Sequence, residues 1–161
     1  MLHSDYREQN CSIARTLELI GERWTILVLR EAFLGTRRFD EIQANLGIAR
    51  NVLQTRLRRL LDAGIMRREL YQDRPPRYEY RLTAKGVDLW PVIVSLLNWG
   101  DRHAAPNGPP VVLEHKGCGG ALDDRRRCTR CGAELEAWEV SVLAGPGALD
   151  SRSRRLAPAA G

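Results

Sequence analysis

Apolar side chains recur at three- and four-residue steps through residues 12–33, which is the spacing of amphipathic helices. Gly21 falls inside this stretch and Gly35 follows it, at places where glycine favours a break between helices. The pattern therefore predicts two short helices, each with one buried face. Their apolar residues are Ile13, Leu17, Ile20, Trp24, Leu27 and Val28.

A second pair of predicted helices is separated by only a tight turn. Residues 39–46 place apolar side chains on one helical face, and Gly47 suits the positive φ with which helices commonly end. The next helix begins at about Ala49 or Asn51 and ends at Ala63. Its leucines face the core, and its polar residues face outward. The outward residues are Gln54, Thr55, Arg56, Arg58 and Arg59.

An extended pattern replaces the helical one after Gly64. Residues 65–71 and 77–82 are predicted strands, and residues 72–76, which include two adjacent prolines, form the loop of a hairpin. Thr83 then caps a long final helix that runs to about Arg102. The apolar residues of that helix exceed what a small domain can cover alone.

The order of helix, tight turn, helix and hairpin is typical of a winged helix-turn-helix. The sequence thus predicts a mainly α fold with a small β-hairpin wing, followed by a small C-terminal zinc-ribbon-like unit. With 161 residues, one domain and an appendage are expected. The predicted parts are a DNA-binding and dimerisation domain over 1–103, a linker over 104–112, a Cys/His unit over 113–143 and a disordered tail over 144–161.

Basic residues are concentrated in the predicted winged helix. The chain has 25 Lys and Arg against 20 Asp and Glu, and only Lys85 and Lys116 are lysine. Between Thr36 and Lys85 there are twelve basic and six acidic residues, so the rest of the chain is close to neutral. Arginine suits bidentate contact with phosphate and guanine. This charge predicts a polyanionic partner, namely double-stranded DNA.

The predicted DNA contacts follow from the geometry of this motif. The second helix of the pair lies in the major groove, and the hairpin reaches the flanking backbone or the minor groove. Any single arginine is also explained as a solvated surface charge, but clustering on one helix face and one hairpin favours DNA binding. The predicted base contacts are Arg50, Asn51, Gln54, Thr55 and Arg58, and the phosphate or minor-groove contacts are Arg37, Arg38, Arg74 and Arg77.

Two short turns near the C-terminus share one pattern of ligand, two residues, ligand and glycine. His115 and Cys118 form the first pair, and Cys128 and Cys131 form the second. Two such turns can hold one tetrahedral Zn²⁺, and four protein donors would make the site structural. The alternative is free thiols or a disulfide. Zinc is favoured because the segment has few apolar residues with which to fold unaided.

From Cys11 to about His103, the chain resembles the HxlR-type regulators, which are winged-helix relatives of the MarR group. The resemblance implies a dimeric DNA-binding repressor or activator of bacterial transcription, and we expect a homodimeric repressor. Such a dimer would bind a pseudo-palindromic operator. Without a signal peptide, a cytoplasmic location is expected. The resemblance also implies a dimer interface formed by the N-terminal segment and the last long helix, with Trp90, Ile93, Leu97 and Trp99. The matching stretches are residues 19–30, 38–42, 47–57 and 75–86.

Two positions bear on how closely the family pattern applies. Members of the family often have serine where this chain has Ala49, so Asn51 either caps the recognition helix or contacts bases. Many members also carry a cysteine at the position of Cys11, and in some of them it responds to oxidants. Cys11 is therefore either a redox-responsive thiol or a buried residue of the dimer interface.

Other functional classes receive little support from the sequence. We find no phosphate-binding glycine loop, no dinucleotide fingerprint and no nucleophile spaced with a base, so an enzyme is not expected. The alternative is a protein-interaction module that docks a partner through the winged helix and the ribbon. The polar N-terminus and the short apolar runs predict no export and no membrane span. The operator sequence and any small-molecule effector are not identified.

Overall fold

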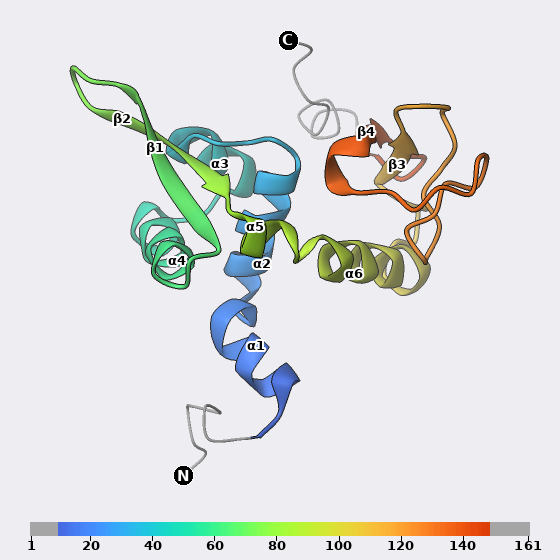
Figure 1. Ribbon diagram of the computed structural model, residues 1–161, viewed down its shortest axis with the longest axis horizontal. Coiled ribbons are helices and arrows are strands. Elements are labelled where there is room, and N and C mark those ends of the chain that lie inside the picture. Colours follow the sequence, from blue (N-terminus) through green and yellow to red (C-terminus); the bar gives the residue numbers. More distant parts are fainter. Residues whose placement is uncertain (1–9, 149–161) are drawn as a thin grey trace. The chain divides into compact units, whose positions relative to one another are not determined.

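The computed structural model describes residues 10–148 of the chain. Contacts divide it into two compact units, which are shown in Figure 1. Of the described residues, the first unit comprises 10–32 and 36–86, and the second comprises 33–35 and 87–148. Across the described residues, no helix has the length and apolar content needed to cross a membrane.

Four helices form most of the first unit, as the hydrophobic spacing predicts. They are α1 (Ser12–Ile20), α2 (Arg23–Phe33), α3 (Phe39–Leu46) and α4 (Arg50–Asp62), although Phe33 itself belongs to the second unit. Burying their apolar faces removes side chains from water and is the main driving force for this packing. The most deeply buried residues here are Val28, Leu29, Ile42, Leu53, Leu57 and Leu60.

The turn between α3 and α4 has the predicted left-handed glycine. Gly47 has φ 62° and ψ 26°, and its N–H donates to the carbonyl oxygen of Gln43 at 2.9 Å. Ala49 is the N-cap residue of α4 and provides no side-chain hydrogen bond. Asn51 therefore does not cap this helix, which corrects one of the two alternatives. It lies in the first turn, and its side chain is exposed.

A buried carboxylate fixes the approach to this turn. Glu31 is only 1% exposed. It accepts hydrogen bonds from Arg30 at 2.7 Å, from Asn45 Nδ2 at 2.9 Å and from Thr36 Oγ1 at 3.2 Å. These bonds connect the end of α2, the following loop and α3. Charge-assisted hydrogen bonds offset the cost of burying a charge, so this network stabilises the packing of α2 against α3.

The wing is an antiparallel hairpin of β1 (Met66–Gln72) and β2 (Arg77–Leu82). Met66 pairs with Leu82 at its base, and the register shifts between Leu70 and Gln72. The hairpin extends away from the helices of its unit (Figure 1). The strands match the predicted ranges to within one residue.

The predicted final helix is divided into α5 (Ala84–Val87) and α6 (Trp90–His103). As expected, Thr83 Oγ1 accepts the Gly86 N–H at 3.2 Å. The prediction of one continuous helix is wrong. Pro91 has no N–H to donate to the carbonyl oxygen four residues earlier, so it interrupts a helix, but it is well tolerated in the first turn of a new one. The boundary between the two units falls within α5, between Gly86 and Val87, so α6 lies entirely in the second unit.

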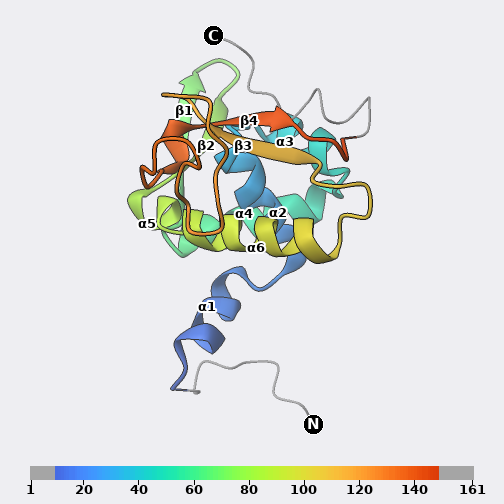
Figure 2. The same cartoon turned by 90° about the vertical axis from the view of Figure 1, so that its right-hand side faces the viewer.

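The second unit packs α6 against a small C-terminal β structure (Figure 2). Strands β3 (Val111–His115) and β4 (Val140–Ala144) are antiparallel, and the 3₁₀ helix η1 (Ala137–Glu139) precedes β4. The predicted domain boundaries therefore require correction. Helix α6 belongs with the C-terminal unit, and β3 begins inside the predicted linker. Of the predicted disordered tail, residues 149–161 lie outside the described part of the chain.

Candidate nucleic-acid interface and metal centre

One face of α4 is entirely polar and exposed. Its core-facing residues, Leu53, Leu57 and Leu60, are completely buried or nearly so. This amphipathic arrangement fixes the rotation of the helix and leaves its opposite face accessible. All five residues predicted to contact bases are exposed on α4, namely Arg50, Asn51, Gln54, Thr55 and Arg58.

The side chains of this face differ in whether they already form intramolecular contacts. Arg50 lies 3.4 Å from the carboxylate of Asp40, and its guanidinium lies 4.7 Å from the centre of the Phe39 ring. Thr55 Oγ1 donates to the Asn51 carbonyl oxygen at 2.9 Å, four residues earlier. Between residues 10 and 148, the side chains of Asn51, Gln54 and Arg58 have no hydrogen-bond partner. These three are therefore the most available for base contacts.

The segment before α3 is attached to the wing. The carbonyl oxygen of Arg37 accepts the Tyr80 N–H at 2.8 Å, so the chain here runs beside β2. The Arg38 guanidinium lies 4.8 Å from the centre of the Tyr71 ring and 3.9 Å from Glu79. Both arginine side chains are exposed. Arg37 and Arg38 thus belong to the same surface as the hairpin, which their position in the sequence did not reveal.

Arginines at the base of the wing are neutralised by glutamates. Arg67 and Arg81 each lie 2.7 Å from the Glu69 carboxylate, and Arg81 also pairs with Glu79 at 2.9 Å. The hydrogen bond from Arg67 is the main reason that the pKa of Glu69 is lowered. Arg68 instead lies over the Tyr78 ring at 4.0 Å. Arg67, Arg68 and Arg81 were not among the predicted DNA contacts, and their partners could not be identified from the sequence.

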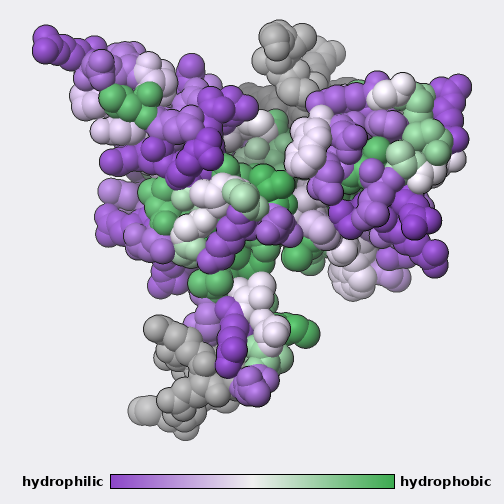
Figure 3. Space-filling view, in the orientation of Figure 1, coloured by the Kyte–Doolittle hydropathy of each residue, from purple (hydrophilic) through white to green (hydrophobic). Residues whose placement is uncertain are grey.

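The tip of the wing carries unneutralised positive charge. Arg74 and Arg77 are exposed, and neither has an ion-pair partner among the described residues. Figure 3 shows that hydrophilic residues predominate over the hairpin. The arrangement can therefore place two guanidinium groups against a phosphate backbone or in a minor groove.

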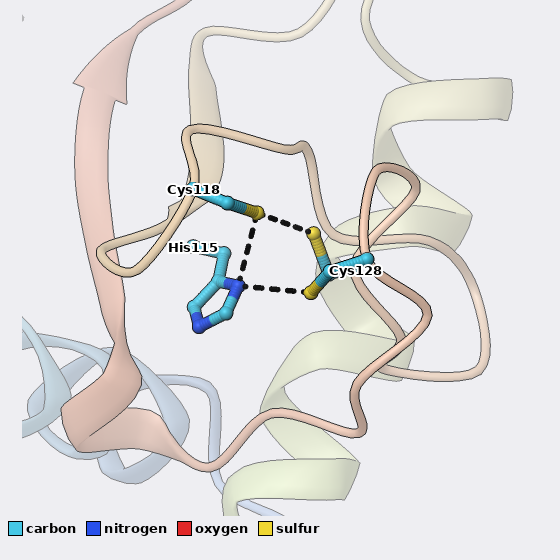
Figure 4. Close-up of side chains that lie close together, drawn as sticks. His115, Cys118 and Cys128 are labelled. Carbon is cyan, nitrogen blue, oxygen red and sulfur yellow. Dashed lines mark hydrogen bonds between the residues drawn. The ribbon is translucent and has the colours of Figure 1, made fainter.

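Four side chains meet in the second unit with the composition predicted for a metal site. The donor atoms of His115, Cys118, Cys128 and Cys131 all lie within 4.8 Å of one another. Cys118 Sγ lies 3.3 Å from both Cys128 Sγ and His115 Nδ1 (Figure 4). Cys131 Sγ lies 3.4 Å from that same nitrogen. A tetrahedral zinc would separate two sulfurs by about 3.8 Å and a sulfur from a nitrogen by about 3.5 Å.

Glycines permit the two ligand-bearing turns. Gly119 and Gly132, which follow the second ligand of each pair, have φ values of 71° and 75°. Their N–H groups donate to the carbonyl oxygens of His115 and Cys128, both at 2.8 Å, so the two turns are built alike. A Cβ atom at Gly120 would collide with Cys128 Sγ. The backbone therefore approaches the donor cluster too closely for any other residue at position 120.

Backbone groups favour an ionised thiol within the cluster. The Cys131 N–H donates to the Cys128 sulfur and is the main cause that lowers the pKa of Cys128 to about 6. The pKa of Cys118 is raised, chiefly by its hydrogen bond with Cys128. Arg130 donates to the Cys118 carbonyl oxygen at 2.6 Å and brings positive charge beside the thiols. Thiolates are the form in which cysteine binds metals.

The residues predicted for the dimer interface fall into different environments. Trp90 is only 5% exposed and packs with Val94 in the core of its own unit, and Leu97 is packed against that core. Ile93 is half-buried. Trp99 is 59% exposed. Trp90 is therefore committed to its own chain, which sequence reasoning could not detect because it could not identify the partner of the buried face.

Cys11 stands at the N-terminal end of α1, and its side chain is exposed. It is thus not buried within the core of its own chain. A redox response of Cys11 and its contact with a second copy both remain predictions. The apolar residues Ile13 and Leu17 on the same helix are also exposed.

The helix pair α3 and α4, the Gly47 turn and the basic hairpin define the winged helix-turn-helix class of DNA-binding proteins. Residues 19–107 match the model of the HxlR-like helix-turn-helix family. The chain belongs to this family, and the predicted resemblance is confirmed. It is a DNA-binding regulator of transcription.

Relatives extend the likeness beyond the helix-turn-helix. The chain is 49% identical over 143 residues to "Uncharacterized HTH-type transcriptional regulator Rv3095" of Mycobacterium tuberculosis, covering 88% of this chain and 90% of that protein. Because 143 residues exceed the span 1–107, the alignment must enter the C-terminal unit. The crystal structure of PA1607, a proposed transcription factor, is 36% identical, with a TM-score of 0.67 and coverage of 82% and 93%.

A third similar structure is the redox regulator HypR in its oxidized form. It is 33% identical, with a TM-score of 0.55, and the match covers 58% of this chain and 97% of HypR. The likeness therefore concerns a shorter part of this chain than the likeness to PA1607.

Proposed function

We propose that the protein is a homodimeric repressor that recognises a pseudo-palindromic operator through α4 and its wing. The observation that carries the proposal is the exposed polar face of α4. Asn51, Gln54 and Arg58 have no intramolecular hydrogen-bond partner between residues 10 and 148, so base contact costs them no existing interaction. Repression is the expected sign, because a dimer bound across an operator excludes other proteins from that DNA.

Base and backbone contacts have separate roles in this proposal. Gln54 and Asn51 can form paired hydrogen bonds with adenine, and Arg58 with guanine, each worth about 1–3 kcal/mol of discrimination. Arg50 contributes less because it must first leave Asp40 and Phe39. The arginines of the wing surface position the protein without reading bases. These are Arg37, Arg38, Arg74 and Arg77.

Two apolar helical faces support a homodimer. On α6, Val92, Leu96 and Trp99 are exposed and lie at positions i, i+4 and i+7. Ile13 and Leu17 expose a similar face on α1. Exposed apolar faces of this kind usually mark an interface, and a twofold axis allows one face to pair with its own copy. We assign the α6 contact to Val92, Leu96 and Trp99, with Ile93 beside them, in place of Trp90 and Leu97.

Cys11 is a candidate for a redox response, since the similar protein HypR is named a redox regulator. The thiol is exposed at the start of the helix that carries Ile13 and Leu17. Modification there would alter the surface proposed for dimerisation. Alkylation of Cys11 should therefore weaken the dimer, whereas the Cys11→Ser protein should be insensitive.

We further propose one structural Zn²⁺ held by His115, Cys118, Cys128 and Cys131. Three sulfurs and one imidazole form a donor set that suits this ion, and three of their separations, 3.3, 3.3 and 3.4 Å, lie within about 0.5 Å of those in a tetrahedral site. Four protein donors leave no coordination position for substrate, so the ion would stabilise the fold rather than catalyse a reaction.

The alternative is a protein-docking module. A docking face should expose aromatic or aliphatic residues. The exposed face of α4 instead carries Asn51, Gln54 and Arg58. Family and fold are those of regulators, so both enzyme and docking functions are disfavoured.

Selection of genomic fragments by the purified protein tests the function. At about 150 mM salt, weak nonspecific attraction is suppressed, and one enriched inverted repeat is expected. The Gln54→Ala protein should select a repeat in which one symmetric pair of positions is no longer preferred. Arg125→Ala, an exposed arginine in the C-terminal unit, is the matched control and should retain the full preference. Uniform recovery of fragments by the unaltered protein would contradict sequence-specific binding and favour the docking module.

A further inference from the structure

Helix α6 has two apolar stripes, one packed against the core and one exposed. Trp90, Val94 and Leu97 pack on the core of the C-terminal unit. A second stripe, Val92, Leu96 and Trp99, is exposed. The stripes have the same spacing and are offset by two residues, which is about 200° around a helix. One face of α6 thus packs on the core of the C-terminal unit, which includes the metal ligand Cys128, and the opposite face is available for a second copy.

The core beneath α6 is small and includes a metal ligand. Cys128 is only 2% exposed and lies in the same apolar cluster as Trp90 and Val94. Leu135, which is fully buried, accepts a hydrogen bond through its carbonyl oxygen from Trp90 Nε1 at 3.3 Å. The apolar contacts of α6 and the donor cluster are therefore parts of one packed structure.

The other end of α6 is also attached to the ligand-bearing segment. Arg102 Nη1 donates to Asp124 Oδ2 at 2.7 Å, and Asp124 lies in the loop between the two ligand pairs. Trp90 near the start of the helix and Arg102 near its end thus both form hydrogen bonds with the C-terminal segment that carries the four ligands. Small units with so little core usually require a metal or disulfide to remain folded.

From this arrangement, we propose that Zn²⁺ occupancy of the Cys3His site controls homodimerisation and, through it, operator affinity. The metal-closed unit holds α6 with its Val92, Leu96 and Trp99 stripe exposed to a second copy. Without the ion, the segment that packs against Trp90 and binds Arg102 becomes less ordered. The orientation of the exposed stripe is then no longer fixed. The inference rests on both the zinc site and the homodimer of the proposed function.

A second copy is the occupant that fits this stripe. Within α6, the charged residues Asp101 and Arg102 come only after Trp99, so the stripe itself carries no charge. An uncharged stripe is self-complementary across a twofold axis, whereas a charged partner would require matching charges here. Such a contact brings two winged helices into one molecule, as a palindromic operator requires.

The test compares the full-length protein with and without Zn²⁺. Metal content, sedimentation velocity and operator binding are measured after loading with one equivalent of Zn²⁺, after chelation under reducing conditions and after Zn²⁺ is restored. We expect the dimer dissociation constant to rise at least about tenfold on chelation, operator affinity to fall with it and both to recover. Recovery excludes irreversible unfolding as the cause.

Variants separate the metal from the interface. Cys131→Ser removes an exposed ligand and should behave like the chelated protein, whereas Arg125→Ala removes an exposed side chain from the loop between the two ligand pairs and should change neither metal content nor dimerisation. Leu96→Asp should bind one equivalent of Zn²⁺ yet remain monomeric. That combination would show that dimerisation requires the α6 face and that the metal site forms without the dimer.

Each outcome distinguishes the proposals. Failure to bind Zn²⁺ stoichiometrically would refute the metal site, and with it the coupling. Stoichiometric binding with an unchanged dimer constant would refute the coupling alone and leave both parts of the proposed function intact. A protein that remains monomeric in every state, yet binds its operator specifically, would refute the homodimer and therefore the coupling.

Discussion

Replacing Gln54 with alanine should abolish a base preference rather than weaken DNA binding in general. The side chain is exposed on α4 and has no hydrogen-bond partner among residues 10–148, so its removal does not disturb the fold. A bidentate contact with a base is worth about 1–3 kcal/mol, or about 5- to 150-fold in affinity. In a homodimer on a perfect palindrome, the loss occurs twice, which amounts to roughly 2–6 kcal/mol.

Replacing Arg77 with alanine provides the comparison. Arg77 lies at the wing tip without an ion pair in the described chain, and its expected partner is a phosphate. Loss of one phosphate contact lowers the slope of log affinity against log salt by about 0.9 per subunit. It should weaken cognate and altered operators by the same factor.

Fluorescence anisotropy distinguishes the two variants. Each protein is titrated with the selected operator and with operators altered at single positions, from about 50 to 200 mM salt. Gln54→Ala should bind the cognate site and one symmetric pair of altered sites equally, with the salt slope unchanged. If Arg77→Ala changed base preference selectively, or Gln54→Ala weakened all sites equally, the assigned roles would be wrong.

Three further predictions concern stability and the metal centre. Glu31→Gln should lower the free energy of unfolding of the winged-helix unit by about 2–3 kcal/mol in urea, because its charge-assisted hydrogen bonds are lost, whereas exposed Glu41→Gln should have little effect. Gly120→Ala should prevent stoichiometric Zn²⁺ binding, measured by metal analysis, because the new Cβ would collide with Cys128 Sγ. Gly132→Ala should still bind Zn²⁺ but with less stability by about 1–2 kcal/mol, because its φ is 75°.

The helices and the hairpin were predictable because burial of one face leaves a periodic trace in the sequence. Leu53, Leu57 and Leu60 fix the rotation of α4, and the polar face follows without further information. The donor cluster was predictable for a different reason. Each ligand pair is only three residues apart and is followed by a glycine with positive φ, so local turns determine most of the geometry.

Charge pairing was not predictable from the same sequence. Glu69 pairs with Arg67 and Arg81, whereas Arg77, a predicted contact, has no ion pair among the described residues. Those partners depend on cross-strand register. Burial of Glu31 was likewise missed, because its three donors come from the end of α2, the following loop and α3.

Helix α6 illustrates how a correct observation led to an incomplete assignment. Its excess of apolar residues predicted a dimer interface, since a small domain could not cover them. The excess instead divides into two stripes, and the one containing Trp90 is covered by a unit whose own core includes a predicted metal ligand. A count of apolar residues does not distinguish the two stripes. Their positions do, because residues two apart in sequence lie on nearly opposite sides of a helix. Both stripes belong to one helix. Metal binding at Cys128 can therefore affect the exposed stripe that contains Trp99, although the metal ligands and the apolar residues of α6 were predicted for unrelated reasons.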